Sequence, residues 1–187
     1  MIKGITMGKK YELTDNTKEI EGHTLHQIKA LKSFGNVNKG DLGGWIEGYD
    51  NLSQSGNAWV YDKARVWGKA KVFDTALVYG HAMIYGDVRV CGNAKVHGHA
   101  QVFDCALVGD CAEVYGCARV YDGALVCDNA KVHGHAIVFN DSMVYGDSMV
   151  YGYAEVWDKA KVYGSAKVYG YASVCGVTWV RGNAVVS

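Results

Sequence analysis

A unit of six residues repeats without insertion or deletion through residues 58–187. Its third position is Val at 21 of 22 occurrences, its first is Ala at 18 of 22, and its fifth is always Gly, Asp or Asn. The first and third residues of a strand point to the same side, so Ala and Val share one buried face. Gly, Asp and Asn tolerate the positive φ of a sharp corner. Each unit therefore predicts a strand of three residues followed by a corner.

Three such sides close a triangle of 18 residues, and stacked triangles pair their backbones in parallel about 4.8 Å apart. We therefore expect an all-β fold, a triangular solenoid of about seven coils over residues 58–187. Residues 1–57 lack the period, and we expect a small β-rich cap and lead-in there. The cap is predicted to have short strands at 11–13, 19–21 and 24–31, a tight turn at Glu21 and Gly22, and a glycine-rich connection at 39–44.

Composition limits the classes of partner. Lys and Arg number 19 and Asp and Glu also number 19, so the formal net charge is zero, and we expect neither a nucleic acid nor a membrane as partner. The amino-terminal sequence lacks the apolar run of a signal peptide, which predicts a cytoplasmic location. Of the six cysteines, Cys91 and Cys127 share a column but lie about 9.6 Å apart, beyond disulfide reach. We expect free thiols.

The uninterrupted hexads, among them NAKVHG, HAQVFD and CAEVYG, and the lead-in KGDLGGWIEGYDNLSQSGN resemble hexapeptide-repeat proteins of the YdcK-like group. This resemblance implies a single-stranded left-handed parallel β-helix. Many hexapeptide acyltransferases carry Gly directly after the inward aliphatic residue, whereas here that slot is mostly aromatic and Gly follows one residue later. Because of this departure, the resemblance relates the chain to the enzymes of that superfamily without placing it clearly among them. Similar proteins also occur in phages and prophages, which implies a role directed at the host.

Residues 18 apart stack above one another, which turns the repeat into columns. A fourth-position column contains Tyr61, Tyr79, His97, Tyr115, His133, Tyr151 and Tyr169. It is either a platform on which a ligand stacks, with His97, Tyr115 and His133 as binding residues, or an aromatic ladder that shields the corners.

A sixth-position column contains Lys63, His81, His99, Cys117, His135, Tyr153 and Tyr171. His81, His99, Cys117 and His135 are candidate zinc ligands, because imidazole and thiolate are zinc's preferred donors. The resemblance to acyltransferases implies a second role, in which His99 or His135 acts as the catalytic base. The third interpretation is a row of exposed corner residues.

One outer face carries an apolar stripe. Leu107, Leu125 and Met143 fall on three successive coils, and small residues lie beside them. Such a stripe is typical of a contact surface, so we expect a homo-oligomer, either a dimer or a trimer.

Three functions remain open from the sequence. The first is a non-catalytic binding or scaffold protein, which acts by binding a host protein or by sequestering a small nucleotide-like ligand; it is favoured because no loop leaves the coil after residue 58. The second is an acyltransferase that uses acetyl-CoA or a related thioester. The third is a metal-binding β-helix enzyme with zinc. No cofactor is firmly predicted.

Overall fold

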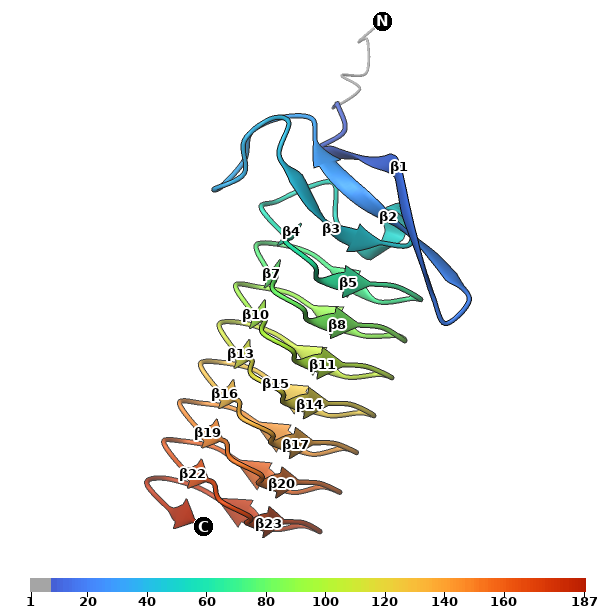
Figure 1. Ribbon diagram of the computed structural model, residues 1–187. Helices are drawn as coiled ribbons and strands as arrows, with labels where there is room; N and C mark the ends of the chain where they lie inside the picture. Colours follow the sequence, from blue (N-terminus) through green and yellow to red (C-terminus); the bar gives the residue numbers. More distant parts are fainter. Residues whose placement is uncertain (1–7) are drawn as a thin grey trace, which may run out of the picture.

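The computed structural model describes residues 8–187 and shows a long three-sided prism with a β-hairpin across one end (Figure 1). Residues 1–7, which begin both the predicted cap and the amino-terminal stretch used to judge a signal peptide, lie outside the described residues. None of the described residues belongs to a helix long and apolar enough to cross a membrane. All six cysteines are free thiols, as predicted.

The cap is a hairpin of two long strands. β1 (Tyr11–Ile20) and β2 (His23–Ala30) pair in antiparallel fashion around the predicted turn, where Glu21 and Gly22 both have positive φ. β2 then pairs antiparallel with β3 (Leu42–Ile46), and β3 pairs parallel with β5 (Arg65–Val66). The cap therefore continues directly into one sheet of the solenoid.

Three parallel sheets form the sides of the prism. The first face contains β3, β5, β8 (Met83–Ile84), β11 (Gln101–Val102), β14 (Arg119–Val120), β17 (Ile137–Val138), β20 (Glu155–Val156) and β23 (Ser173–Val174). The second face contains β4 (Trp59–Val60), β7 (Leu77–Val78), β10 (Lys95–Val96), β13 (Glu113–Val114), β16 (Lys131–Val132), β19 (Met149–Val150), β22 (Lys167–Val168) and β25 (Val185–Val186). The third face contains β6 (Lys71–Val72), β9 (Arg89–Val90), β12 (Leu107–Val108), β15 (Leu125–Val126), β18 (Met143–Val144), β21 (Lys161–Val162) and β24 (Trp179–Val180).

The register confirms the predicted coil of 18 residues. Val96 lies opposite Val78 on one side and Val114 on the other, and the Lys95 N–H donates to the Ala112 carbonyl at 2.9 Å. Every fifth-position residue from Asp62 to Gly182 has positive φ, so each predicted corner is present. The regular strands are two residues long, one fewer than predicted, because the first-position residue belongs to the preceding corner: the Ala100 N–H, for example, donates to the His97 carbonyl three residues earlier at 3.3 Å.

The core is a column of inward Ala and Val side chains. Two exceptions at the first position, Ser142 and Ser148, are also buried. The Ser142 hydroxyl donates to the Phe139 carbonyl at 2.8 Å, and Ser148 repeats this bond with the Tyr145 carbonyl. A buried hydroxyl that donates back to the chain is satisfied, so Ser fits an Ala position.

The predicted connection at 39–44 is wrong, because residues 42–46 form β3. Gly43 and Gly44 are buried there, and a Cβ on either would lie within 2.7 Å of a backbone carbonyl oxygen in the next segment. The two glycines are therefore needed for close approach of the chain and do not mark a loop. β3 and the single bridge from Leu52 to Val72 begin the first turn, which gives about eight turns where seven were predicted. A short 3-10 helix, η1 (Tyr49–Asn51), lies between them.

Candidate functional site

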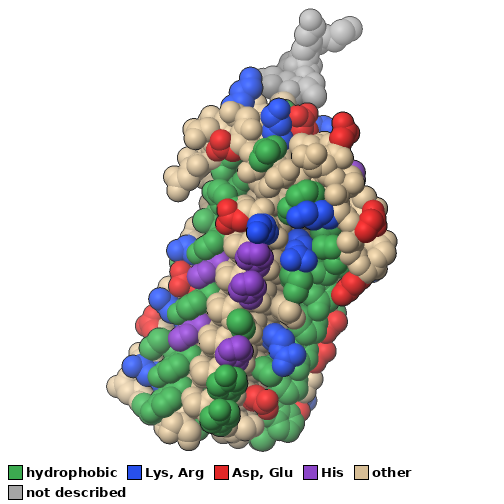
Figure 2. Space-filling model, in the orientation of Figure 1, with side chains coloured by type: hydrophobic (Ala, Val, Ile, Leu, Met, Phe, Trp, Pro, Cys, Tyr) green, Lys and Arg blue, Asp and Glu red, His purple; other side chains and the backbone are tan. Residues whose placement is uncertain are grey.

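The histidines of the sixth-position column lie along one edge of the prism. Figure 2 shows histidine side chains in two short rows on this flank. The rings of His81 and His99 are stacked, with centroids 4.7 Å apart and planes at 12°. His135 stacks on Tyr153 at 4.9 Å, and Cys117 lies in the column between the two groups. The column that the sequence predicts is therefore present, as two aromatic stacks separated by Cys117.

Stacking does not bring the four predicted zinc ligands together around one point. Parallel imidazole planes direct their nitrogen lone pairs side by side, whereas a tetrahedral ion needs them to converge. In residues 8–187, three ligand atoms within 4.8 Å of one another occur only at Asp110, Cys127 and Asp128, at a different corner. His81, His99, Cys117 and His135 form a row of separate donors in this arrangement.

The two candidate catalytic bases are both exposed. His99 and His135 each have a backbone N–H bonded to the carbonyl of Gly116 or Gly152, at 2.7 Å in both cases. Within the described part of the chain, neither imidazole forms a hydrogen bond to a carboxylate that would orient it. A general base normally has such a partner, so the geometry leaves these imidazoles without one.

The fourth-position column of the second face is an aromatic ladder. His97 stacks between Tyr79 and Tyr115, at 4.4 and 5.0 Å, with interplanar angles of 4° and 1°. Tyr115 stacks on His133 at 4.7 Å, and His133 stacks on Tyr151 at 5.0 Å. Both faces of His97, Tyr115 and His133 are thus covered by neighbouring rings. These residues offer only their edges to a ligand, which excludes a base or sugar from stacking within the column as it stands.

Burial in this ladder favours the neutral form of its histidines. Burial lowers the pKa of His97 below its ordinary value; the Glu113 charge acts against this and the Lys95 charge adds to it. Burial also lowers the pKa of His133, and the charge of Lys131 adds to the effect.

We predict that acid destabilises the protein through this ladder. As the pH falls below about 6.5, the unfolded chain takes up protons at His97 and His133 that the folded ladder resists, so the free energy of unfolding decreases. Tyr already occupies this column at other levels, so the double variant His97→Tyr/His133→Tyr should fold and lose less stability on acidification. Urea unfolding at pH 7.5 and 5.5 measures the difference. An equal loss in both proteins would contradict the prediction.

The apolar stripe of Leu107, Leu125 and Met143 lies on β12, β15 and β18 of the third face. All three side chains are half-buried, and the strands pair directly with one another. Gly109 is covered because the Leu107 side chain leans over it, with Cδ2 3.2 Å from the position that a Cβ would take. The stripe is therefore a packed, continuous apolar surface.

The thiols beside the stripe are neutral. Burial raises the pKa of Cys127 to about 11, and the charges of Asp128 and Asp110 add to this. Burial likewise raises the pKa of Cys91. Thiols that stay protonated are poor nucleophiles and poor metal ligands, so they contribute apolar surface here.

Two open grooves lie on the prism. The larger, about 400 Å³, is lined by Asp122, Gly123, Asn140, Asp141, Asp158, Lys159, Gly176 and Val177. A second, about 300 Å³, is lined by Tyr61, Asp62, Leu77, Tyr79 and Lys95. The candidate catalytic and metal-binding histidines line neither groove. The sequence signal for the larger one is Gly123, which leaves a gap in a corner column that otherwise has side chains.

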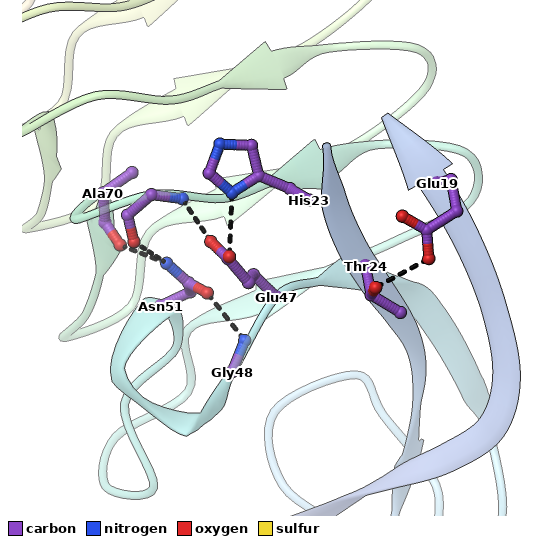
Figure 3. Close-up of polar contacts among 8 residues, drawn as sticks. Glu19, His23, Thr24, Glu47, Gly48, Asn51 and Ala70 are labelled. Carbon is purple, nitrogen blue, oxygen red and sulfur yellow. Dashed lines mark hydrogen bonds and ion pairs between the residues drawn. The ribbon is translucent and has the colours of Figure 1, made fainter. Parts of the chain in front are cut away.

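Sequence reasoning missed a His and Glu pair at the junction between cap and solenoid (Figure 3). His23 Nδ1 lies 2.8 Å from Glu47 Oε1, and the Gly68 N–H donates to Glu47 Oε2 at 2.7 Å. Burial alone would raise the pKa of Glu47, but these two hydrogen bonds and the charge of His23 outweigh it and hold the pKa below its ordinary value. Asn51, which is buried beside them, donates to the carbonyls of Gly68 and Ala70. The cluster fastens β2 and the first turn to the second turn.

Comparison with known proteins supports the resemblance over a short segment. The chain is 46% identical over 39 residues to the "Uncharacterized acetyltransferase YdcK" of Escherichia coli K12. The match covers 21% of this chain and 12% of that protein, so the chain spans only a small part of that protein's length. No family model matches the chain. The partial similarity and the observed β-solenoid both agree with hexapeptide-repeat architecture.

Proposed function

We propose that this chain is a non-catalytic scaffold whose solenoid joins copies of itself through the apolar stripe of Leu107, Leu125 and Met143. One observation carries the proposal: all strand pairs of residues 59–186 keep the same register of 18 residues. No described segment beyond β4 leaves the prism to enclose a substrate. A rigid prism with flat sides suits the display and alignment of subunits.

The stripe differs from the equivalent positions of the second face. There, Glu113 lies between Lys95 and Lys131, with its oxygens 3.2 and 3.6 Å from their ammonium nitrogens. That charged row is satisfied within one chain and is well solvated. The stripe has no such charges, and its burial against a second copy would remove apolar surface from water. This contrast favours the third face as the contact.

We predict that Leu125→Arg lowers the molar mass measured by light scattering, because it places a charge at the centre of the contact. Ile137→Arg is the matched control: it occupies the same position of the hexad on the first face and is also half-buried. Its molar mass should equal that of the unmodified protein. An unchanged molar mass of Leu125→Arg, or an equal decrease in molar mass for both variants, would contradict a contact through the stripe.

A second candidate function is acyl transfer from acetyl-CoA. The match to a protein named as an acetyltransferase favours it, and His99 or His135 would then remove the proton from the acceptor. The two functions separate in a thermal unfolding experiment with saturating acetyl-CoA. A rise in melting temperature would support acyl transfer, whereas an unchanged melting temperature supports the scaffold.

A further inference from the structure

A basic depression lies where the cap meets the first turn. Its volume is about 300 Å³, at the lower end of the roughly 300 to 1,000 Å³ typical of small-molecule sites. It is lined by Gly8, Lys9, Lys32, Ser53, Gln54 and Ser55. These residues come from three segments: the chain before β1, the chain after β2, and the chain between η1 and β4.

Two lysines, Lys9 and Lys32, line the depression, and a third, Lys10, is buried beside the segment that contains Ser55. Lys10 is buried, and its Nζ donates to the carbonyl of Ala58 at 2.9 Å and to that of Ser55 at 3.4 Å. Among residues 8–187, no carboxylate oxygen lies within 4.0 Å of the ammonium of Lys9, Lys10 or Lys32. Burial lowers the pKa of Lys10 to about 8, and the charge of Lys32 contributes to this. The site is therefore electrostatically positive in a protein whose net charge is zero.

The lining is held in place by local hydrogen bonds. The Lys10 N–H donates to Gln54 Oε1 at 2.7 Å, which fixes the chain just before β1 against the segment before β4. The hydroxyl oxygens of Ser53 and Ser55 lie 3.0 Å apart, and the Ser55 N–H donates to Ser53 Oγ at 3.1 Å. The Lys9 ammonium lies 4.4 Å from the centre of the Tyr49 ring. Lysine and serine residues thus line a preformed space.

We propose that this depression binds a phosphate group, either free or as a phosphate monoester, between the ammonium groups of Lys9 and Lys32 and the hydroxyls of Ser53 and Ser55. Charge-assisted hydrogen bonds to phosphate are the strongest that these side chains can form. The anion would also offset the repulsion between Lys10 and Lys32. Because the site joins the cap to the first turn, binding stabilises their junction. This proposal goes beyond the scaffold function and does not depend on it.

Isothermal titration of the full chain with inorganic phosphate and with a nucleoside monophosphate, at low ionic strength, tests the site. We expect saturable binding at one site per chain. Lys9→Gln/Lys32→Gln should weaken it by about tenfold or more, since two charged donors are lost. The matched control is Lys29→Gln, an exposed lysine of β2 that does not line the depression; its affinity should be unchanged.

A second measurement locates the binding. Phosphate should shift the backbone amide resonances of Ser53 and Ser55 in NMR spectra, and the double variant should show no such shifts while keeping the remaining spectrum. Tighter binding of inorganic phosphate identifies the free ion as ligand, and tighter binding of the nucleotide identifies a monoester. The proposal is overturned by absence of saturable binding of both probes, or by equal weakening in the Lys29→Gln control.

Discussion

Val120→Asp should strongly destabilise the fold. Val120 is fully buried on β14, with Val102 and Val138 as its neighbours in the coils on either side. An Asp there has no polar partner in a core of Ala and Val, so either the charge or a protonated carboxyl stays unsatisfied. We expect a loss of about 4 kcal/mol or more, a large share of the roughly 5 to 15 kcal/mol that stabilises a typical domain. Circular dichroism during thermal unfolding measures it.

The matched control changes the neighbouring residue of the same strand. Arg119 is exposed and points away from the core, so Arg119→Asp should leave the melting temperature within a few degrees of the original. Equal melting temperatures for the two variants, whether both are lowered or both unchanged, would refute the assignment of inward and outward positions.

Gly44→Val should disrupt the junction between the cap and the solenoid. A Cβ on Gly44 would lie 2.7 Å from the Ala64 carbonyl oxygen and 2.7 Å from Val60 Cγ1, so β3 could no longer lie against residues 60–64. Overpacking of this kind costs about 3 kcal/mol. Hydrogen exchange should show faster exchange in β1, β2 and β3 than in the unmodified protein, with β14 to β23 unaffected, because coils far from the junction do not contact it.

Gly48→Ala is the control for this substitution. A Cβ at Gly48 would meet no other atom within 4 Å, and its φ of −159° is an extended conformation that other residues adopt. We expect exchange rates like those of the original protein. Normal exchange in β3 of Gly44→Val would show that the close approach of the chains is not required.

The repeating part of the fold was predictable because two simple rules act on every unit. Alternation along a short strand sends Ala and Val inward, and the corner requires a positive φ that Gly, Asp and Asn tolerate. Asp104 and Asn140, with φ of 57° and 56°, adopt the same corner as the glycines. No knowledge of distant contacts is needed for either rule, so the local pattern was sufficient.

The first turn could not be predicted in this way. Its inward residues are Ile46 and Leu52, six apart, but the next, Val60, follows eight residues later, so the period is interrupted before it becomes regular. Two glycines in succession also suggest a loop, although they serve close packing here. Such packing depends on residues 59–64 and is visible only in three dimensions.

The sequence predicted which residues of the candidate site stack in columns, but it could not predict how their side chains are oriented or which distant residues they contact. Stacking of His81 on His99 follows from their spacing, whereas the orientation of each ring depends on side-chain torsions that the sequence does not specify. The contact between His23 and Glu47 joins residues 24 apart in different elements. The basic depression likewise combines Lys9, Lys32 and Ser53, which the hairpin brings together from distant positions.

The constant register of 18 residues also has an evolutionary consequence. A duplication or deletion of one whole coil changes the length of the prism but leaves each column on its own side, so a gene for this protein can gain or lose such segments without redesigning its surfaces. A change of six residues preserves the hexad but rotates everything downstream by one side. The apolar stripe, the aromatic ladder and the histidine edge would then each be divided between two faces. Selection should therefore accept length variants of this solenoid in steps of three hexads.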